Sequence, residues 1–382
     1  MGMVPFPSAP GRGGKRMTDI AHDNHFVPRG LLRRWSTDAT HLEAYRLLVS
    51  HANVPLWDRR ALKSVANQSD LYTSFDGQDE VDDFERWIGR KFETPALEVV
   101  AKLESGGQLS PTMWKQLIKF VALQDMRTPS GFIEFVRNAG PIFNSHLESV
   151  VADFNKSVTG VAIDTVTEGD TPARAHVIEP NVLRRDGTKI FGDSFRVRFE
   201  PPSEPGGMVK VIPEVKSSRS LWMESTRTRM EGRGVDILCG HRWSVVAPHG
   251  EFEWPITDRP VLKMNYWGPT RYTFHGGYGN AGSEIMMPIS PTRLLYTQVG
   301  SNNDSRFTAT EERTREIQRL LVERAFRWVF VRTRADWVVK VRPREVNPHA
   351  YAAEQDVLNQ WHSAHGGREA EFYSSKAVLT TS

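Results

Sequence analysis

The 382-residue sequence contains a single cysteine, Cys239, and no long uninterrupted apolar run. One cysteine excludes an internal disulfide framework and a multi-cysteine zinc or iron–sulfur site, and this usage is typical of a reducing cytoplasm. A membrane helix needs about eighteen consecutive apolar residues, which no window supplies. Residues 1–17 lack the apolar core of a secretory signal, so we predict a disordered leader there and expect a cytoplasmic protein.

Charge of one sign is also scarce, because 49 Lys and Arg oppose 46 Asp and Glu and leave a net charge of +3. Bulk charge therefore does not indicate a nucleic-acid or membrane partner. The sequence has no GxxxxGK[ST], GxGxxG or GxSxG motif. The phosphate loops and nucleophile elbow that those motifs build are excluded.

What the sequence does contain is a succession of helical and strand patterns, which predicts one α+β domain over residues 18–346. The helical part covers about residues 55–155. It includes a buried helix that begins after Ser110 and ends before Pro129, and a helix over residues 80–90 that Pro95 kinks or restarts. We predict that this half packs against an antiparallel sheet covered by a C-terminal helix.

The sheet part covers about residues 160–300, where the apolar period shifts toward two. Strands are predicted at residues 195–200, 284–289 and 294–299, with a hairpin turn at Asp186-Gly187. Residues 242–257 are interpreted as two strands around a Pro-His-Gly turn, and residues 265–282 as a functional loop. The covering helix is predicted over residues 310–330 and a further strand over residues 337–342. Residues 347–382 are interpreted as a polar tail with one short helix near residues 354–362.

Two histidines, His22 and His25, lie three residues apart before the apolar segment Phe26-Val27-Pro28. This spacing brings both rings to one divalent ion if the backbone turns, although a metal site needs at least one further ligand from elsewhere. The alternative is a histidine packed under the apolar segment, with one ring nitrogen bonded to the backbone.

Five segments resemble, in order, those of the bacterial domain-of-unknown-function family 4238. They are His22-x-x-His25-Phe-Val-Pro, the acidic helix with Glu85, Trp87 and Phe92-Glu93, the helix end Gln124-x-x-Arg127-Thr-Pro, residues 254–261 and residues 287–291. The resemblance covers about residues 22–335. The sequence departs from the family pattern at Thr257 and at Pro95. The resemblance names a family and implies no reaction.

Charged side chains are predicted inside the core. Asp125 lies on the apolar side of its helix, with Gln124 at the edge of that side, so this carboxylate needs a specific partner. Arg324 points inward on the covering helix and is the candidate partner. A structural ion pair and a functional site remain alternatives here.

One function that these residues suggest is metal-dependent, nuclease-like hydrolysis of nucleic acid. The hypothesis gathers polar residues from both halves into one cleft: His25, Glu85 and Asp258 for catalysis, His22, His25, Glu85 and Glu93 for Mn, Mg or Zn, and Gln124, Arg127 and Arg324 for the substrate. The alternatives are a solvated helix flank for Glu85 and Glu93, and for Asp258 an Asx turn that closes a strand before Pro260.

The other function is a non-catalytic nucleic-acid- or protein-binding module. Residues 313–344 contain ten basic and three acidic residues, interleaved with aromatic residues. Such a segment could grip phosphates and stack bases. The competing interpretation is an amphipathic helix and a strand whose arginines are solvated. Convergence of His25 with Glu85 or Asp258 would favour the enzyme, and a continuous basic face would favour the binding module.

Overall fold

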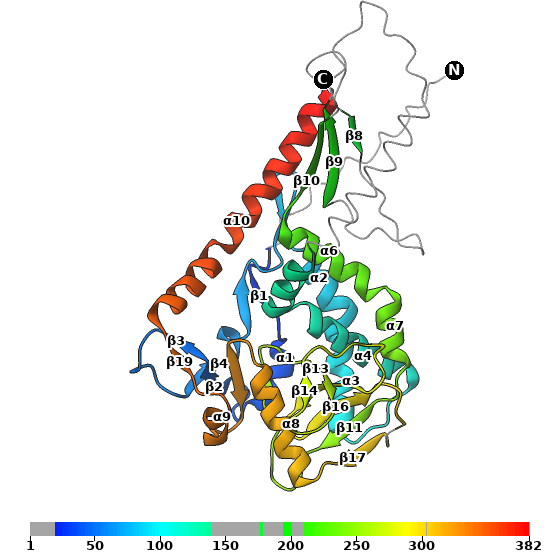
Figure 1. Cartoon of the computed structure of the whole chain (residues 1–382), viewed down its shortest axis with the longest axis vertical. Helices are drawn as coiled ribbons and strands as arrows, with labels where there is room; N and C mark the ends of the chain where they lie inside the picture. The colour runs from blue at the N-terminus through cyan, green and yellow to red at the C-terminus, as the bar shows by residue number, and fades with distance from the viewer. Residues whose placement is uncertain (1–19, 140–175, 179–193, 201–209, 303, 382) are drawn as a thin grey trace, which may run out of the picture.

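The computed structural model describes residues 20–139, 176–178, 194–200, 210–302 and 304–381. The fold is α+β, with helices and several mainly antiparallel sheets, as predicted from the sequence (Figure 1). No helix within these ranges is long and apolar enough to cross a membrane. The predicted turn at Asp186-Gly187 lies outside the described residues.

The helical layer consists of α2 (Asp83–Ile88), a π-helical turn (Gly89–Glu93), α3 (Thr94–Glu104), α4 (Pro111–Met126), α6 (Ser218–Met230) and α7 (Arg233–Gly240). The predicted kink at Pro95 is this π turn, because proline lacks the N–H that a regular turn would use. Ser110 caps α4 as predicted, and its Oγ accepts from the N–H of Met113 at 3.3 Å. A helical segment follows over residues 129–139.

A six-stranded sheet lies between this layer and α8 (Glu311–Arg324). In spatial order its strands are β14 (Tyr272–Thr273), β13 (Leu262–Tyr266), β15 (Ser283–Ser290), β16 (Arg293–Gln298), β11 (Ser244–Ala247) and β17 (Arg306–Thr308). Every residue of β15 is buried. Ile285 and Met287 face the helical core whereas Met286 faces the core under α8, because successive side chains of a strand point to opposite faces.

A four-stranded sheet comprises β12 (Ile256–Thr257), β18 (Trp328–Val331), β2 (His41–Arg46) and β4 (Asp58–Ala61). Smaller pairings join β1 (Asp23–His25) to β5 (Asn67–Ser69), β3 (Leu48–Val49) to β19 (Glu345–Val346), and β6 (Ser74–Asp76) to β7 (Asp79–Val81). A three-stranded sheet contains β8 (His176–Ile178), β9 (Phe195–Glu200) and β10 (Lys210–Val215). The short α1 (Arg29–Leu32) and two 3-10 turns, Arg33–Trp35 and Leu62–Ser64, connect the N-terminal strands.

Four sequence predictions about elements are wrong. Residues 55–82, predicted helical, contain β4 to β7 and a 3-10 turn. Residues 242–257 form no hairpin, because β11 and β12 belong to different sheets. The covering helix ends at Arg324, and β18 follows it. Residues 337–342, predicted as a strand, lie in and just after α9 (Asp336–Val341), where the apolar side chains pack at helical spacing under the four-stranded sheet.

The fifth difference is the largest. The predicted polar tail contains α10 (Pro348–Thr381), a helix of 34 residues. Figure 1 shows α10 in red, running along one side of the molecule from the β3–β19 pair toward β10. It packs against β3, β5 and β6. Short local periodicity did not reveal this helix, because most of its side chains are polar and only a few positions contact the body.

Candidate functional site

A cavity of about 570 Å³ lies between α10 and one face of the four-stranded sheet. Its walls come from six separate parts of the chain, namely Phe26, Arg46, Arg60, residues 64–70, Arg327 with Trp328, and Glu354, Gln355, Leu358, Asn359 and His362 of α10. This volume is within the range of small-ligand sites. The cavity is therefore the candidate functional site.

Two arginine side chains, Arg46 and Arg60, gather in the cavity because of strand register, and a third, Arg327, joins them from the residue before β18. Arg46 stands opposite Trp328 and Arg60 stands opposite Leu42, so the three side chains Arg46, Arg60 and Trp328 share one face of the sheet. The guanidinium carbons of Arg46 and Arg60 lie 5.2 and 5.3 Å from the centroid of the Trp328 ring. Cation–π contact of this kind holds both guanidinium groups beside the aromatic ring.

Glu354 of α10 bridges two of these arginines. Nη2 of Arg46 lies 2.8 Å from Oε1, and Nε of Arg327 lies 2.8 Å from Oε2 of the same carboxylate. Nη1 of Arg46 also donates to the hydroxyl of Tyr351 at 3.2 Å. Arg60 is engaged less closely, since its nearest carboxylate is the exposed Asp58 at 3.7 Å. Arg46 and Arg327 thus bind the carboxylate of Glu354, whereas the third arginine, Arg60, faces the cavity.

Asp258 fixes the backbone from which Arg327 projects. Its carboxylate accepts the N–H groups of Phe326 at 2.9 Å and Arg327 at 2.7 Å, and its own N–H donates to Trp328 O at 3.2 Å. The side chain is buried, and this burial raises its pKa to about 6 against the opposing effect of those hydrogen bonds. The carboxylate predicted to be catalytic therefore holds the backbone of a distant turn at Phe326 and Arg327, rather than forming a local turn before Pro260.

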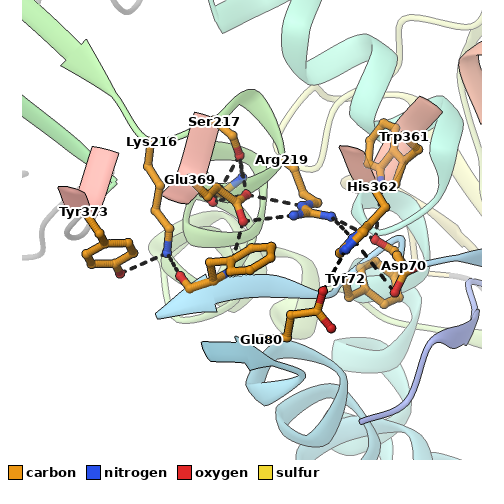
Figure 2. A network of polar contacts seen from close by, with 12 residues as sticks. Asp70, Tyr72, Glu80, Lys216, Ser217, Arg219, Trp361, His362, Glu369 and Tyr373 are labelled. Carbon is orange, nitrogen blue, oxygen red and sulfur yellow. Dashed lines mark hydrogen bonds and ion pairs between the residues drawn. The ribbon is translucent and has the colours of Figure 1, made fainter. Parts of the chain in front are cut away.

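At the other end of the cavity, histidines and carboxylates form a chain of contacts. Nδ1 of His22 lies 2.6 Å from Oδ1 of Asp70, and this hydrogen bond raises the pKa of His22. Nε2 of His362 lies 2.9 Å from Oε1 of Glu80 (Figure 2). His22 is largely exposed, whereas Asp70 and His362 line the cavity.

The wall formed by α10 is held in place by a buried ion pair next to this chain. Arg219 Nη2 donates to Glu369 Oε2 at 2.9 Å, and both side chains are fully buried. Figure 2 shows that Ser217 also donates to this carboxylate and that Arg219 extends toward Asp70, whose carbonyl accepts from both Arg219 and Trp361. Every charge in this network has a partner, so α10 is part of the packed body.

A second polar cluster lies behind the Phe26 wall. Arg127 is fully buried and donates to the carbonyls of His25 at 2.9 Å and Phe26 at 3.0 Å, while its Nη1 lies 2.5 Å from Oε1 of Glu93. Glu85 is a neighbouring charge, and burial raises the pKa of its carboxyl to about 7. With its amide oriented to suit its neighbours, Gln124 donates to Phe26 O at 3.1 Å.

The structure thus brings Gln124 and Arg127 to the backbone of the histidine segment, with Glu93 paired to Arg127 and Glu85 as a further charge beside Arg127. It places His22 with Asp70 instead, and Asp258 directly after β12 of the four-stranded sheet. Burial lowers the pKa of His25, and its Nε2 has no hydrogen-bond partner in the described part of the chain. Within the described ranges, no group of three or more His, Cys, Asp or Glu side chains could hold a metal ion.

The candidate partner of Asp125 is wrong. Asp125 does meet a cation, as its burial requires, but this is Lys263 at 2.5 Å, and Tyr278 also donates to it at 2.8 Å. These contacts lower the pKa of Asp125 against the effect of burial. Arg324, predicted to bind substrate, donates to Glu134 at 2.9 Å. Both charges therefore serve internal pairs.

The basic segment 313–344 is largely neutralised in the same way. Its arginines pair with carboxylates, some on α8 itself and others elsewhere in the fold: Arg313 with Glu284 and Glu316, Arg315 with Glu311, Arg319 with Glu323, Arg324 with Glu134, Arg327 with Glu354, Arg332 with Glu253, and Arg334 with Glu43. Arg342 and Arg344 donate to backbone carbonyls. The segment therefore does not present a row of unpaired cations, although Arg327 and Trp328 from it line the cavity.

Sequence reasoning missed Arg46, Arg60 and Glu354. The alternation in residues 41–46 could have identified β2, but residues 58–61 show no alternation, and no local signal shows that these strands share a sheet with β18 or that α10 supplies a carboxylate. Arg46 and Glu354 are 308 residues apart in the chain. Only the folded structure brings them together.

Comparison with known proteins adds one finding to this geometry. The model of the family DUF4238, described as proteins of unknown function, matches residues 23–335. The chain belongs to DUF4238. The matched residues include Arg46 and Arg60 of the cavity and the polar cluster around Arg127. Helix α10 lies after the last matched residue. No curated protein and no solved structure matches the chain.

Proposed function

We propose that this DUF4238 protein binds nucleic acid by accepting one phosphate-bearing nucleotide in the cavity beside α10. The observation that carries the proposal is a cavity of about 570 Å³ lined by Arg46, Arg60 and Arg327, with the guanidinium groups of Arg46 and Arg60 beside the Trp328 ring. Arginine is the residue best suited to phosphate, because its planar guanidinium offers several donors in a fixed geometry.

The other walls suit the remainder of a nucleotide. Phe26, Val65 and Leu358 supply apolar surface, and Gln68 and Asn359 supply amides. A base has an apolar face and polar edges, so a mixed lining of this kind accommodates it. The cytoplasm is the compartment in which we expect this binding.

Of the two functions that the sequence predicts, this is the binding alternative, relocated from the whole basic segment to one cavity. The metal-dependent hydrolase draws no support from the geometry, since the described residues hold no group of three metal ligands. Internal pairing of the arginines in residues 313–344 likewise favours a local site over a broad basic face.

The test is fluorescence anisotropy with a labelled single strand of about twelve nucleotides. We expect the native protein to bind and Arg60→Ala to bind roughly tenfold more weakly, because a charge-assisted hydrogen bond contributes about 1.5–3 kcal/mol. Arg60 is the sharpest choice, since its nearest carboxylate is 3.7 Å away and its removal leaves no buried charge unpaired.

Arg315→Ala is the matched control, because Arg315 is an exposed arginine that pairs with Glu311 on α8. It should bind like the native protein. Absence of binding by the native protein, or equal losses in both variants, would overturn the proposal.

A further inference from the structure

We infer that the cavity selects a phosphate monoester, at the end of a strand or on a free nucleotide, and that this group binds in exchange for the carboxylate of Glu354. This inference rests on the proposed function and names its ligand more closely. Three observations support it: the bridging position of Glu354, the charges that line the cavity, and the place of Glu354 along α10.

Glu354 occupies the position that an oxyanion ligand would take. Its two oxygens lie 2.8 Å from nitrogens of Arg46 and Arg327, which come from adjacent strands or their ends. The structure therefore demonstrates that this pair of arginines accepts an oxyanion at hydrogen-bond distance. A phosphate that reaches the same nitrogens must displace the carboxylate, because both cannot occupy one position.

The charges decide which phosphate can do so. With Glu354 displaced, the lining contains Arg46, Arg60 and Arg327 against Asp70, a surplus of two positive charges. A phosphate monoester carries close to two negative charges at pH 7 and has three free oxygens. An internal phosphodiester carries one negative charge and would only replace one monoanion by another.

The exchange also has an entropic cost that penalises the phosphodiester. Glu354 is attached to the protein, so its effective concentration at the arginines is high, whereas a ligand arrives from dilute solution. A singly charged phosphate gains no additional attraction to offset this advantage. A doubly charged phosphate gains the interaction with Arg60, which Glu354 does not contact within the described structure.

The position of Glu354 allows its side chain to leave without unfolding α10. The residue lies in the second turn of the helix, and its side chain is 15% exposed. The buried anchor of α10, the pair of Glu369 with Arg219, is fifteen residues farther along, about 22 Å at 1.5 Å per residue. Rotation of the Glu354 side chain therefore leaves the anchor intact.

The experiment compares internally labelled strands of one sequence with a 5′-phosphate, a 3′-phosphate or hydroxyl groups at both ends, by fluorescence anisotropy at about pH 7.5. The native protein should prefer at least one phosphorylated strand by roughly tenfold. The favoured end identifies the source of the phosphate. Competition by a nucleoside monophosphate against the favoured strand shows whether a free nucleotide suffices.

The variant Glu354→Gln removes the internal anion and keeps the shape of the side chain. It should bind all three strands more tightly than the native protein and discriminate less between phosphate and hydroxyl ends. Glu371→Gln, an exposed substitution on the same helix, should match the native protein. Circular dichroism establishes that both variants fold.

Equal affinity of the native protein for all three strands would overturn this inference and leave the proposed function standing. Absence of binding to any strand would overturn both. Weaker binding by a folded Glu354→Gln protein would overturn the exchange, because a competing anion cannot assist the ligand that it excludes.

Discussion

At the scale of the residue, Glu85 keeps a carboxylate oxygen, Oε2, buried without a hydrogen-bond partner within the described structure. Burial is the largest cause of the rise in its pKa to about 7, and Arg127 opposes the rise. The folded protein therefore holds a proton on Glu85 that the unfolded chain, with the ordinary pKa near 4.5, releases in mildly acidic solution.

We expect Glu85 to reduce stability as the pH rises. Because the folded-state pKa is raised, its stabilising effect is complete below about pH 4.5 and is lost as the pH passes through about 7. Glu85→Gln stays neutral, so the free energy of unfolding of the variant relative to the native protein should increase by up to about 3 kcal/mol between pH 5 and pH 8. Urea unfolding at both pH values measures this difference.

Glu98→Gln provides the control for that experiment, since Glu98 is exposed on the neighbouring α3. Its difference from the native protein should stay near zero at both pH values. An equally flat difference for Glu85→Gln would contradict the assignment of a buried proton to Glu85.

Some of these residue roles could be predicted from sequence and others could not. The helical wheel correctly placed Asp125 toward the core and required a partner for it. The partner is Lys263, on a strand 138 residues away, and no local pattern distinguishes Lys263 from Arg324. Nor does a local pattern reveal the partners of Asp258, whose carboxylate accepts hydrogen bonds from two backbone N–H groups of a distant turn.

At the scale of the element, α10 shows how a mostly polar segment becomes structural. Its Glu369 is buried against Arg219, with Ser217 and Ser220 donating to the same carboxylate (Figure 2). A buried ion pair of this kind contributes little when compared with an apolar pair, but the loss of one partner leaves an uncompensated charge.

We therefore expect Glu369→Ala to lower the free energy of unfolding by about 3–5 kcal/mol. The double variant Arg219→Met with Glu369→Leu should recover most of this loss, because it removes both charges and retains apolar volume. Urea unfolding of the full chain tests the expectation, with the exposed Glu371→Ala as control. A double variant as unstable as Glu369→Ala would refute the account, since the lost stability would then not arise from an unpaired charge.

The sequence predicted those elements whose limits are set locally. The helix α4 follows from Ser110 at its cap and from its apolar periodicity, and β15 and β16 follow from short apolar runs. The sequence prediction was wrong for α9, because the apolar residues Val338 and Val339 are compatible with either a strand or a helix. In this short segment, packing against α8 and the four-stranded sheet determines that the chain forms a helix.

At the scale of the whole molecule, the distribution of charge matters more than its sum. The basic residues of segment 313–344 suggest a strong local positive charge, but carboxylates from distant parts of the chain pair with most of its arginines. We therefore propose that a nucleic acid meets its cationic partners at the cavity, which Arg46, Arg60 and Arg327 line.

This predicts a shallow dependence of nucleic-acid affinity on salt. Each phosphate contact with a single strand contributes about −0.7 to the slope of log K against log salt concentration. One terminal phosphate and at most one neighbour should give a slope between about −0.7 and −1.5, and Arg334→Ala, outside the cavity, should not change it. Anisotropy titrations at several salt concentrations measure the slope, and a value steeper than about −4 would indicate a broad basic face instead.

The sequence by itself determined the α+β class, the DUF4238 resemblance, the limits of α4 and the requirement that Asp125 find a cation, because periodicity, capping and the cost of a buried charge act over a few residues. The tertiary structure alone decided which charges meet. Arg46, Arg60, Arg327 and Glu354 lie on separate elements, and strand register and the docking of α10 bring them to one cavity. Pairing of charges depends on distance in space, which the order of residues along the chain does not encode locally.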